Sequence, residues 1–486
     1  MQSPFAPAQD LIPEGILLLG AVVCWAAGAV RPTVRLRTLQ AISAVTLLAA
    51  AVSCLFYLRN LPVGGYTAYS DGLIVDRFAL FTIPTLCAFA LFTVLAGDAV
   101  AERIRPHAGE YHGLVLMATL GGALLVSARE MIAFYVALEL LSVSLYVLVG
   151  MAKTDPRGSE AGFKYLIFGA ASSAVLLYGL ALLYGLTGTT VLTEVAQHLG
   201  HTTAASALGI ALVLVGLSFK LGAVPFHQWV PDVYEGAPAP IAGLIATLSK
   251  TAGFAAVARL AVVTFGVSAS TWTAVIAALA VASMVYGNVV ALAQTRMRRL
   301  LAYSSIGQAG FVLMGLLAWR SDQQGVGAAL FYLFTYGITL VGAFAAVALV
   351  EAAGVGDNID DYRGLSRRAP AAAAVLALAM VSLVGIPPLV GFFAKLFVFE
   401  AAVLAGYAWL LVIAVASTVI SAGYYLRVLK VMFVDAPQGE EPTELPPADI
   451  PVRVAVVVCA LATVALGAAA QPLLALAVGG SGQLIR

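Results

Sequence analysis

The stretch FKLGAVPFHQWVPD, residues 219–232, decides how this chain folds, because it places Lys220 and Pro225 inside an apolar run long enough to cross a bilayer. Proline removes a backbone donor and clashes with the preceding turn, so we expect the helix to break or kink at membrane depth. Such a break is tolerated only where the freed backbone groups are buried in protein or face a wet cavity.

A second stretch, SLVGIPPLVGFFAKLFVF at residues 382–399, repeats this combination. Pro387 and Pro388 interrupt it shortly before Lys395. Two interrupted helices with a lysine beside each break are typical of an internally duplicated transporter. The alternative is a pair of ordinary proline kinks, which are common in membrane helices. The lysine at each break favours duplication.

The composition places the chain in a lipid bilayer. Of its 486 residues 61% are hydrophobic and 10% are charged, and the formal net charge is +1. We therefore expect no nucleic-acid partner. The four cysteines stand singly in apolar runs, the five histidines are too scattered to hold haem, and no dinucleotide or nucleotide-phosphate motif is present. We expect neither a cofactor nor a metal, with any redox chemistry taking place elsewhere.

Runs of about 20 apolar residues predict fourteen membrane-spanning helices, an all-α polytopic fold. They cover residues 11–30, 38–58, 77–98, 112–128, 131–151, 161–186, 205–230, 240–266, 271–293, 302–320, 325–351, 371–402, 407–432 and 452–477. The seventh and the twelfth predicted helices contain the two breaks.

Basic residues gather in alternate loops, at residues 31–37, 103–105, 153–157, 296–299, 363–368 and 427–430. The intervening loops hold little more than Arg59, Arg77, Arg129 and Arg320. The positive-inside rule then places the first set in the cytoplasm and both termini on the outer side. The segment DAPQGEEPTELPPAD, residues 435–449, is too rich in proline and glutamate to span, so we expect a solvated cytoplasmic loop there.

Five charged residues lie inside the predicted helices: Glu139, Lys164, Lys220, Lys250 and Lys395. A charge at the centre of a membrane helix costs about 2.5–3.5 kcal/mol even on the lenient insertion scales. Such residues must be paired, hydrated or required for function, and together they indicate an ion path. A buried lysine, unlike an arginine, can release its proton and so suits a relay.

Glu139 lies among leucines in ALELLS. We expect it to pair with Lys220 in one state and to release it in another, which would change the proton affinity of the lysine. The alternative is a static ion pair that joins two helices.

Three residues could support this chain. Lys164 lies close to a cytoplasmic helix end and could reach the interface. His227 follows the break at Pro225 and could bridge Lys220 and Lys250. Tyr303 could donate a hydroxyl to a chain of water, although tyrosine is also a common interface anchor.

Two other charged residues, Arg259 and Glu400, lie near helix ends and are expected to extend to the membrane surface without a function.

Several segments closely resemble the antiporter-like membrane subunits of respiratory complex I, and most of all its subunit N. They are YVALELLSVSLYVLVG (135–150), EAGFKYLIFGAASSAVLLYG (160–179), FKLGAVPFHQWVPDVYEGAPAPIAGLIATLSKTAGF (219–254), RRLLAYSSIGQAGFVLMG (298–315) and GIPPLVGFFAKLFVF (385–399). The resemblance covers most of the chain after residue 110. The same family fold occurs in Mrp-type sodium/proton antiporters.

The resemblance implies two inverted five-helix repeats. The chain would then comprise helices 1–3 (residues 1–110), a first repeat of helices 4–8 (111–266), a second repeat of helices 9–13 (267–434), and the acidic loop with helix 14 (435–486).

It also implies a role in proton translocation, as a non-redox subunit of a proton-pumping NADH:quinone oxidoreductase in a bacterial plasma membrane. Glu139, Lys220, Lys250 and Lys395 match the residues of the family's proton chain, and Lys164, His227 and Tyr303 match its supporting positions. The match favours a modulating role near Glu139 for Lys164 over simple extension to the interface. The implied partners are other membrane subunits, the lipid bilayer and, indirectly, quinone and a peripheral redox arm.

Three alternatives remain open on the sequence alone: an Mrp-like sodium/proton antiporter, the equivalent subunit of a ferredoxin- or F420-dependent complex, and a structural spacer. The antiporter is less favoured because the sequence offers no obvious second buried carboxylate for Na⁺. Four intramembrane lysines argue against the spacer.

Overall fold

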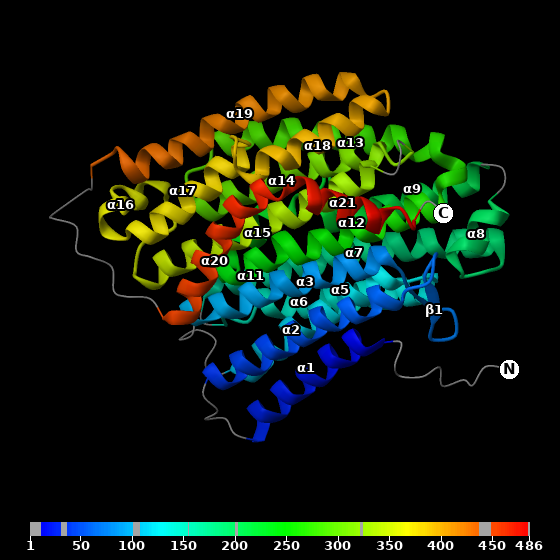
Figure 1. Ribbon diagram of the computed structural model, residues 1–486, viewed down its shortest axis with the longest axis horizontal. Helices are drawn as coiled ribbons and strands as arrows, with labels where there is room; N and C mark the ends of the chain where they lie inside the picture. The colour runs from blue at the N-terminus through cyan, green and yellow to red at the C-terminus, as the bar shows by residue number, and fades with distance from the viewer. Residues whose placement is uncertain are drawn as a thin grey trace.

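The computed structural model describes residues 11–30, 36–100, 107–153, 155–199, 203–320, 324–436 and 449–484. This part of the chain is a bundle of long, roughly parallel and antiparallel helices (Figure 1). Most of the acidic loop predicted at 435–449, residues 437–448, lies outside the described residues.

The elements of the N-terminal half are α1 (Ile12–Val30), α2 (Leu36–Asn60), β1 (Tyr66–Ala68), β2 (Leu73–Val75), α3 (Arg77–Ala96), η2 (Gly97–Val100), α5 (Ala108–Ser127), α6 (Met131–Val149), α7 (Pro156–Thr187), α8 (Leu192–His198), α9 (Ala204–Leu221), α10 (Trp229–Gly236), α11 (Ala239–Leu244), the π-helix η4 (Ile245–Ser249), α12 (Lys250–Arg259) and the π-helix η5 (Leu260–Thr264). Those of the C-terminal half are η6 (Gly266–Ser268), α13 (Ala269–Leu292), α14 (Met297–Leu317), α15 (Gln324–Ala352), η7 (Ile359–Tyr362), α16 (Leu365–Arg368), α17 (Pro370–Val384), α18 (Val390–Leu404), α19 (Ala408–Phe433), α20 (Ile450–Ala468) and α21 (Ala470–Ser481).

The prediction of a polytopic all-α fold is confirmed. Among the described residues, 13 helices are long and apolar enough to cross a membrane, and the shorter pair α17–α18 supplies the remaining predicted crossing. Two details differ from the sequence-based expectation. A two-stranded antiparallel hairpin, β1–β2, follows α2, and the last predicted helix is divided at Ala469 into α20 and α21.

Both predicted breaks are present. The seventh predicted helix stops at Gly222, whose positive φ of 65° ends α9, and resumes as α10. The twelfth stops at Gly385, with a φ of 93°, and resumes as α18. Glycine suits both positions because it adopts the left-handed conformation without a Cβ clash.

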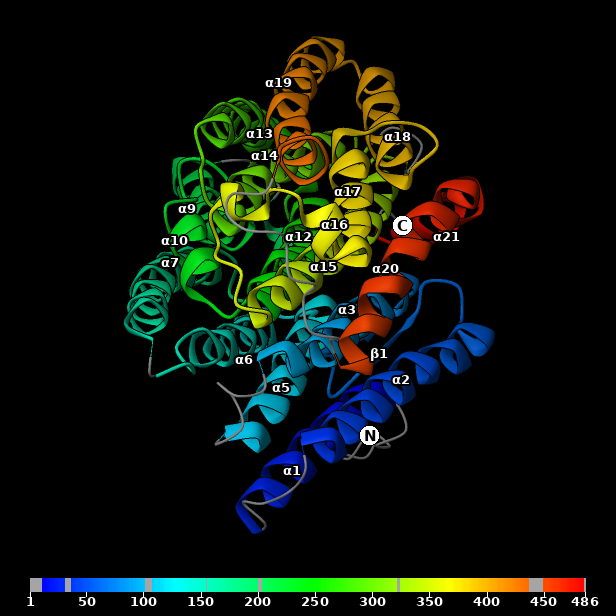
Figure 2. The same ribbon diagram turned by 90° about the vertical axis from the view of Figure 1, so that its left-hand side faces the viewer.

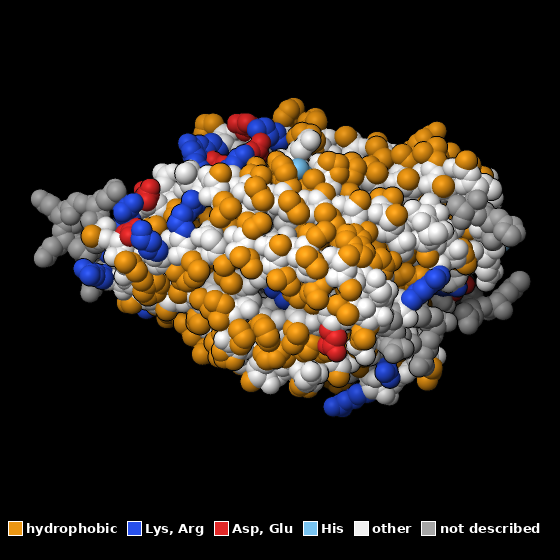
Figure 3. Space-filling model, turned by 90° about the horizontal axis from the view of Figure 1, so that it is seen from above, with side chains coloured by type: hydrophobic (Ala, Val, Ile, Leu, Met, Phe, Trp, Pro, Cys, Tyr) orange, Lys and Arg blue, Asp and Glu red, His pale blue; other side chains and the backbone are white. Residues whose placement is uncertain are grey.

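The start of α1, the hairpin and α8 lie at one end of the bundle, and α16 with the start of α20 lie at the other (Figure 1). Seen end on, α1 and α2 form one edge, α13, α18 and α19 form the opposite edge, and α12 and α15 lie between them (Figure 2). Hydrophobic side chains cover the middle of the face in Figure 3, while charged side chains gather mainly toward one end. This distribution matches a membrane belt.

Glycines bring two helix pairs into backbone contact. A Cβ on Gly121 of α5 would lie 2.4 Å from the backbone nitrogen of Leu141 on α6. A Cβ on Gly287 of α13 would lie at the same distance from the nitrogen of Gly307 on α14. Small residues permit this close approach, which is how membrane helices gain packing energy in the absence of a hydrophobic driving force.

Arg259 does not extend to the membrane surface as expected. It is 3% exposed and its guanidinium binds the Asp76 carboxylate at 2.9 and 3.2 Å. Its Nε also donates to the carbonyl of Val126. Asp76 in turn accepts from the backbone N–H of Ala79 and so caps α3. The pair therefore ties α3 to α12.

Replacing Asp76 with alanine should destabilise the protein by about 3–5 kcal/mol, because it leaves a buried guanidinium without its counter-ion. The thermal unfolding midpoint of the purified protein measures the effect. The matched control is Asp71→Ala, which removes the partner of Arg129 from a pair 3.7 Å apart in which the Asp71 side chain is exposed. The control should cost about 0–1 kcal/mol. Equal losses in the two variants would contradict a structural role specific to the buried pair.

Candidate functional site

The two breaks and the helices around them hold three buried lysines, Lys220, Lys250 and Lys395, which are 2%, 3% and 5% exposed. Among the described residues, none of the three lies within 4.0 Å of a carboxylate oxygen. Each ammonium group donates instead to neutral oxygens. The burial that the sequence predicted for these lysines is confirmed.

Lys220 lies one residue before the end of α9. Its Nζ donates to Ser142 Oγ at 2.7 Å. It also lies 5.8 Å from the ring centroid of Tyr146 and 5.9 Å from that of Tyr165. The ammonium group is thus held by one hydroxyl and two aromatic rings.

Glu139 lies on α6 three residues before Ser142, so the two side chains share a face of the helix. The carboxylate accepts a hydrogen bond from Ser173 of α7, whose hydroxyl oxygen lies 3.2 Å from the Tyr135 hydroxyl. Glu139 and Lys220 are therefore neighbours around Ser142 without forming an ion pair among the described residues. The switching of this pair stays a prediction.

Lys250 begins α12 directly after the π-helix η4. Its Nζ donates to the carbonyl of Ser305 at 2.7 Å and to the Ser305 hydroxyl at 3.0 Å. The break in α9 lies beside it, since a Cβ on Gly222 would be 3.7 Å from Lys250 Nζ. One turn further along α12, a Cβ on Gly253 would be 3.3 Å from Lys220 Cγ. The backbone break therefore lies between Lys220 and Lys250.

Lys395 lies on α18 and points back at the end of α17. Its Nζ donates to the carbonyls of Leu383 and Val384 at 3.1 and 2.9 Å, and it lies 5.1 Å from the ring centroid of Phe311. These two carbonyls belong to the last turn of α17, which has no further helical donors. The negative end of the helix dipole thus faces the cation.

A row of polar side chains connects the second lysine to the third. The Ser304 hydroxyl, next to Ser305, hydrogen bonds to the hydroxyl of Tyr425 from α19. Gln308 Nε2 lies 3.5 Å from the same Tyr425 hydroxyl, and its Oε1 accepts from the hydroxyl of Tyr332 on α15. Gln308, Tyr332 and Lys395 then line one small cavity.

Most of this row was not predicted from the sequence. The sequence pointed to Tyr303, which adjoins Ser304, but not to Gln308, Tyr332 or Tyr425. A signal was present, because Ser304 and Gln308 are four residues apart and so face the same side of one helix.

Lys164 does not reach Glu139 directly. Its ammonium group binds Glu160 at 2.7 Å and Asp232 at 2.9 Å. Asp232, on α10 just after the break, also binds Arg299 of α14 at 2.8 Å. Burial raises the pKa of Asp232, but the hydrogen bonds from Lys164 and Arg299 outweigh it and hold that pKa below its ordinary value. This carboxylate, not named from the sequence, joins α7, α10 and α14.

His227 and Tyr303 lie on either side of Tyr286. The His227 ring centroid is 4.6 Å from that of Tyr286, which is 6.4 Å from that of Tyr303. His227 Nδ1 is buried and has no hydrogen-bond partner within the described part of the chain. Neither side chain makes a hydrogen bond to a lysine that the described residues record. The predicted bridge between Lys220 and Lys250 is therefore not direct.

The sequence also understated the buried carboxylates. Glu14 of α1 is only 7% exposed, so Glu139 is not the sole acid inside a spanning helix. Glu14 belongs to α1, which lies at one edge of the bundle (Figure 2). Among the described residues, no group of three or more histidine, cysteine or acidic side chains could hold a metal ion.

Comparison with known proteins identifies the family. The family model described as "NADH:quinone oxidoreductase/Mrp antiporter, TM" matches residues 128–421. NAD(P)H-quinone oxidoreductase subunit 2 of Synechococcus elongatus is 41% identical over 477 residues, 96% of this chain and 91% of that protein. NADH-quinone oxidoreductase subunit N 2 of Symbiobacterium thermophilum is 42% identical over 415 residues, 82% of this chain and 81% of that protein.

Solved structures agree. A chain of respiratory complex I from Thermus thermophilus, 34% identical, superposes with a TM-score of 0.80 over 96% of this chain and 99% of that chain. A chain of the Mrp complex from a Dietzia species has a TM-score of 0.85 over 97% of both chains, at 22% identity, and so shows the common fold alone. The chain belongs to the family of antiporter-like membrane subunits described as NADH:quinone oxidoreductase/Mrp antiporter.

Proposed function

We propose that this chain is the N-type, proton-translocating membrane subunit of an NADH:quinone oxidoreductase. It carries no redox centre, and electron transfer in other subunits drives its proton movement. The observation that carries the proposal is the row of three buried lysines, whose ammonium groups donate to neutral oxygens and, among the described residues, form no ion pair with a carboxylate. A cation held without a carboxylate can give up its proton without leaving an unpaired buried anion behind.

The first step takes place around Ser142. When the Glu139 carboxylate turns from Ser173 toward Lys220, it stabilises the ammonium form of the lysine. When it turns back to Ser173, the positive charge loses that partner and proton release becomes easier. The shared face of α6 makes both arrangements reachable by side-chain rotation alone.

The second step crosses the break in α9 and continues through α14. A proton that leaves Lys220 reaches Lys250 next to Gly222, with water completing the gap. From Lys250 the hydroxyls of Ser305, Ser304 and Tyr425 lead to Gln308. Tyr332 and the small cavity then lead to Lys395. Each hydroxyl of this row can accept one hydrogen bond and donate another, as a relay requires, and the Gln308 amide both donates and accepts a hydrogen bond.

The relatives named above as quinone oxidoreductase subunits support a place among other membrane subunits of such a complex in a bacterial plasma membrane. Their identities of 41% and 42% are about twice that of the Mrp chain. We further propose that both termini face the periplasm and that the end carrying α16 faces the cytoplasm, following the distribution of basic loops.

Lys220→Ala should lower proton pumping in membrane vesicles by at least about tenfold, equivalent to about 1.4 kcal/mol in a barrier. Turnover of NADH with quinone should fall with it if the two are tightly coupled. Pumping and turnover are measured side by side in complexes shown to assemble. The matched control is Lys430→Ala, whose side chain is 67% exposed at the end of α19. Full pumping with normal turnover in Lys220→Ala would return this lysine to a structural role.

Glu139→Gln should impair pumping while assembly stays normal, because the amide can still accept from Ser173 but cannot offer a negative charge to Lys220. The decisive comparison is pumping against the amount of assembled complex. Intact pumping together with poor assembly would support the static ion pair instead.

Gln308→Leu should slow proton transfer by about fivefold or more, since it leaves the Tyr332 hydroxyl without its acceptor and such a buried group costs about 1–3 kcal/mol. The rate of vesicle acidification at saturating NADH measures this. Tyr178→Phe, on the exposed face of α7, is the control and should leave the rate unchanged. Equal rates for Gln308→Leu and the wild type would remove Gln308 from the relay.

A further inference from the structure

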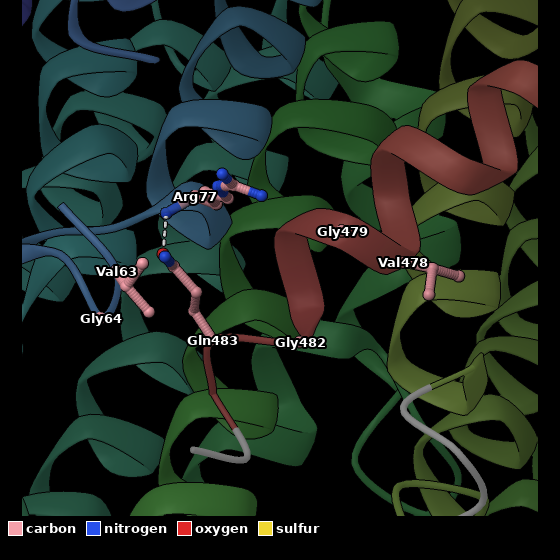
Figure 4. A pocket seen from close by; sticks show the side chains of 7 residues that line it. All are labelled: Val63, Gly64, Arg77, Val478, Gly479, Gly482 and Gln483. Carbon is pink, nitrogen blue, oxygen red and sulfur yellow. Dashed lines mark hydrogen bonds between the residues drawn. The ribbon is translucent and has the colours of Figure 1, made fainter. Parts of the chain in front are cut away.

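Two adjoining cavities open between α2, α3 and α21, away from the lysine row. The larger has a volume of about 570 Å³ and is lined mainly by apolar side chains, including Leu55, Phe81 and Leu476. The smaller is lined by the loop at Gly64 and by Gln483 near the chain end (Figure 4). Arg77 and Gly479 line both. We call the two together the α3–α21 groove. Its volume lies in the range of small-molecule sites.

The groove opens toward the lipid. Leu476 is 63% exposed and Leu55 is 56% exposed, so the described part of the chain does not cover these apolar lining residues. Gly479 has no atom within 4 Å of the position of a Cβ, so its backbone faces open space. The wall of the groove is thus mainly apolar, and Arg77 lies where its two cavities meet.

Arg77 belongs to a small group of arginines that depart from the positive-inside distribution. Of the four in the intervening loops, Arg129 donates to the carbonyl of Asp71 at 3.3 Å. Arg320 donates to the carbonyl of Gly266 at 3.2 Å and stacks on Trp319. These two arginines are bound within the chain.

Arg59 and Arg77 are the other two, and both are exposed. Within the described residues, neither guanidinium has a recorded hydrogen bond or ion pair. Arg77 does have a hydrogen bond to Gln483, but the backbone makes it: the N–H donates to Gln483 Oε1 at 2.5 Å. The Arg77 side chain points away from that bond (Figure 4). Arg59 directly follows Leu58, which lines the larger cavity. Arg59 itself lines neither cavity, so one unpaired guanidinium, that of Arg77, lines the groove and a second belongs to a residue next to its wall.

We propose that the α3–α21 groove binds one anionic phospholipid, with the phosphate on Arg77 and Arg59 and an acyl chain along Leu55, Phe81 and Leu476. Guanidinium groups bind phosphate oxygens in pairs of charge-assisted hydrogen bonds. A purely apolar partner helix would leave the positive charges of the two arginines without a counter-ion, whereas a phosphate supplies one. The proposal does not depend on the proposed function, since it concerns a site remote from the lysine row.

Native mass spectrometry of the intact complex, extracted in a mild detergent from its own membrane, tests this by counting bound phospholipids. The double variant Arg59→Gln/Arg77→Gln and the single variant Gly479→Leu should each lose one anionic phospholipid. The first removes the charge, and the second fills the groove without changing charge. Arg320→Gln and Gly185→Leu are the matched controls and should retain the wild-type number. Gly185, like Gly479, faces open space, but on α7.

An unchanged phospholipid number in either groove variant would overturn the proposal, because charge and groove must both be required. A second measurement leaves Arg59 and Arg77 unchanged. A photoreactive benzophenone amino acid in place of Leu476 should give an adduct with the mass of a phospholipid. An adduct with another protein subunit would identify the groove as a subunit contact and overturn the lipid assignment.

Discussion

Backbone carbonyls that lose their helical donors inside a bilayer must find new donors, and this constraint organises the whole site. The clearest case is the end of α17, where Lys395 satisfies the carbonyls of Leu383 and Val384. The lysine and the break stabilise each other, since the helix end supplies partial negative charge and the ammonium group supplies donors. Neither feature would be tolerated alone at that depth.

The three lysines are held in related but unequal ways. Lys395 is held by backbone carbonyls, Lys250 by a carbonyl and a hydroxyl, and Lys220 by a hydroxyl and aromatic rings. Only Lys220 has an acid, Glu139, one helical turn from its hydroxyl partner. In the proposed mechanism, the charge that switches therefore lies at one end of the row, and the rest of the row is a fixed set of dipoles through which a proton would pass.

Much of the fold and of the lysine site could be predicted from the sequence, because these features depend on local sequence patterns. The spans follow from apolar runs, the breaks from glycine and proline, and the burial of the lysines from their place in those runs. What could not be predicted depends on contacts between distant segments. Tyr425 meets Ser304 across 121 positions and Lys164 meets Asp232 across 68. Arg259 resembled an interface residue because its partner, Asp76, lies 183 positions earlier.

The contact between Arg259 and Asp76 also bears on how this fold can change. Of the first three helices α1 and α2 lie at one edge, and none of the three contributes a residue to the lysine row, so they resemble a removable extension. Yet Asp76 supplies the negative charge for an arginine on α12, the same helix that begins with Lys250. A shorter version of the fold that lost these helices would have to exchange Arg259 for a neutral residue at the same time. The first three helices could therefore be lost only together with, or after, the replacement of Arg259.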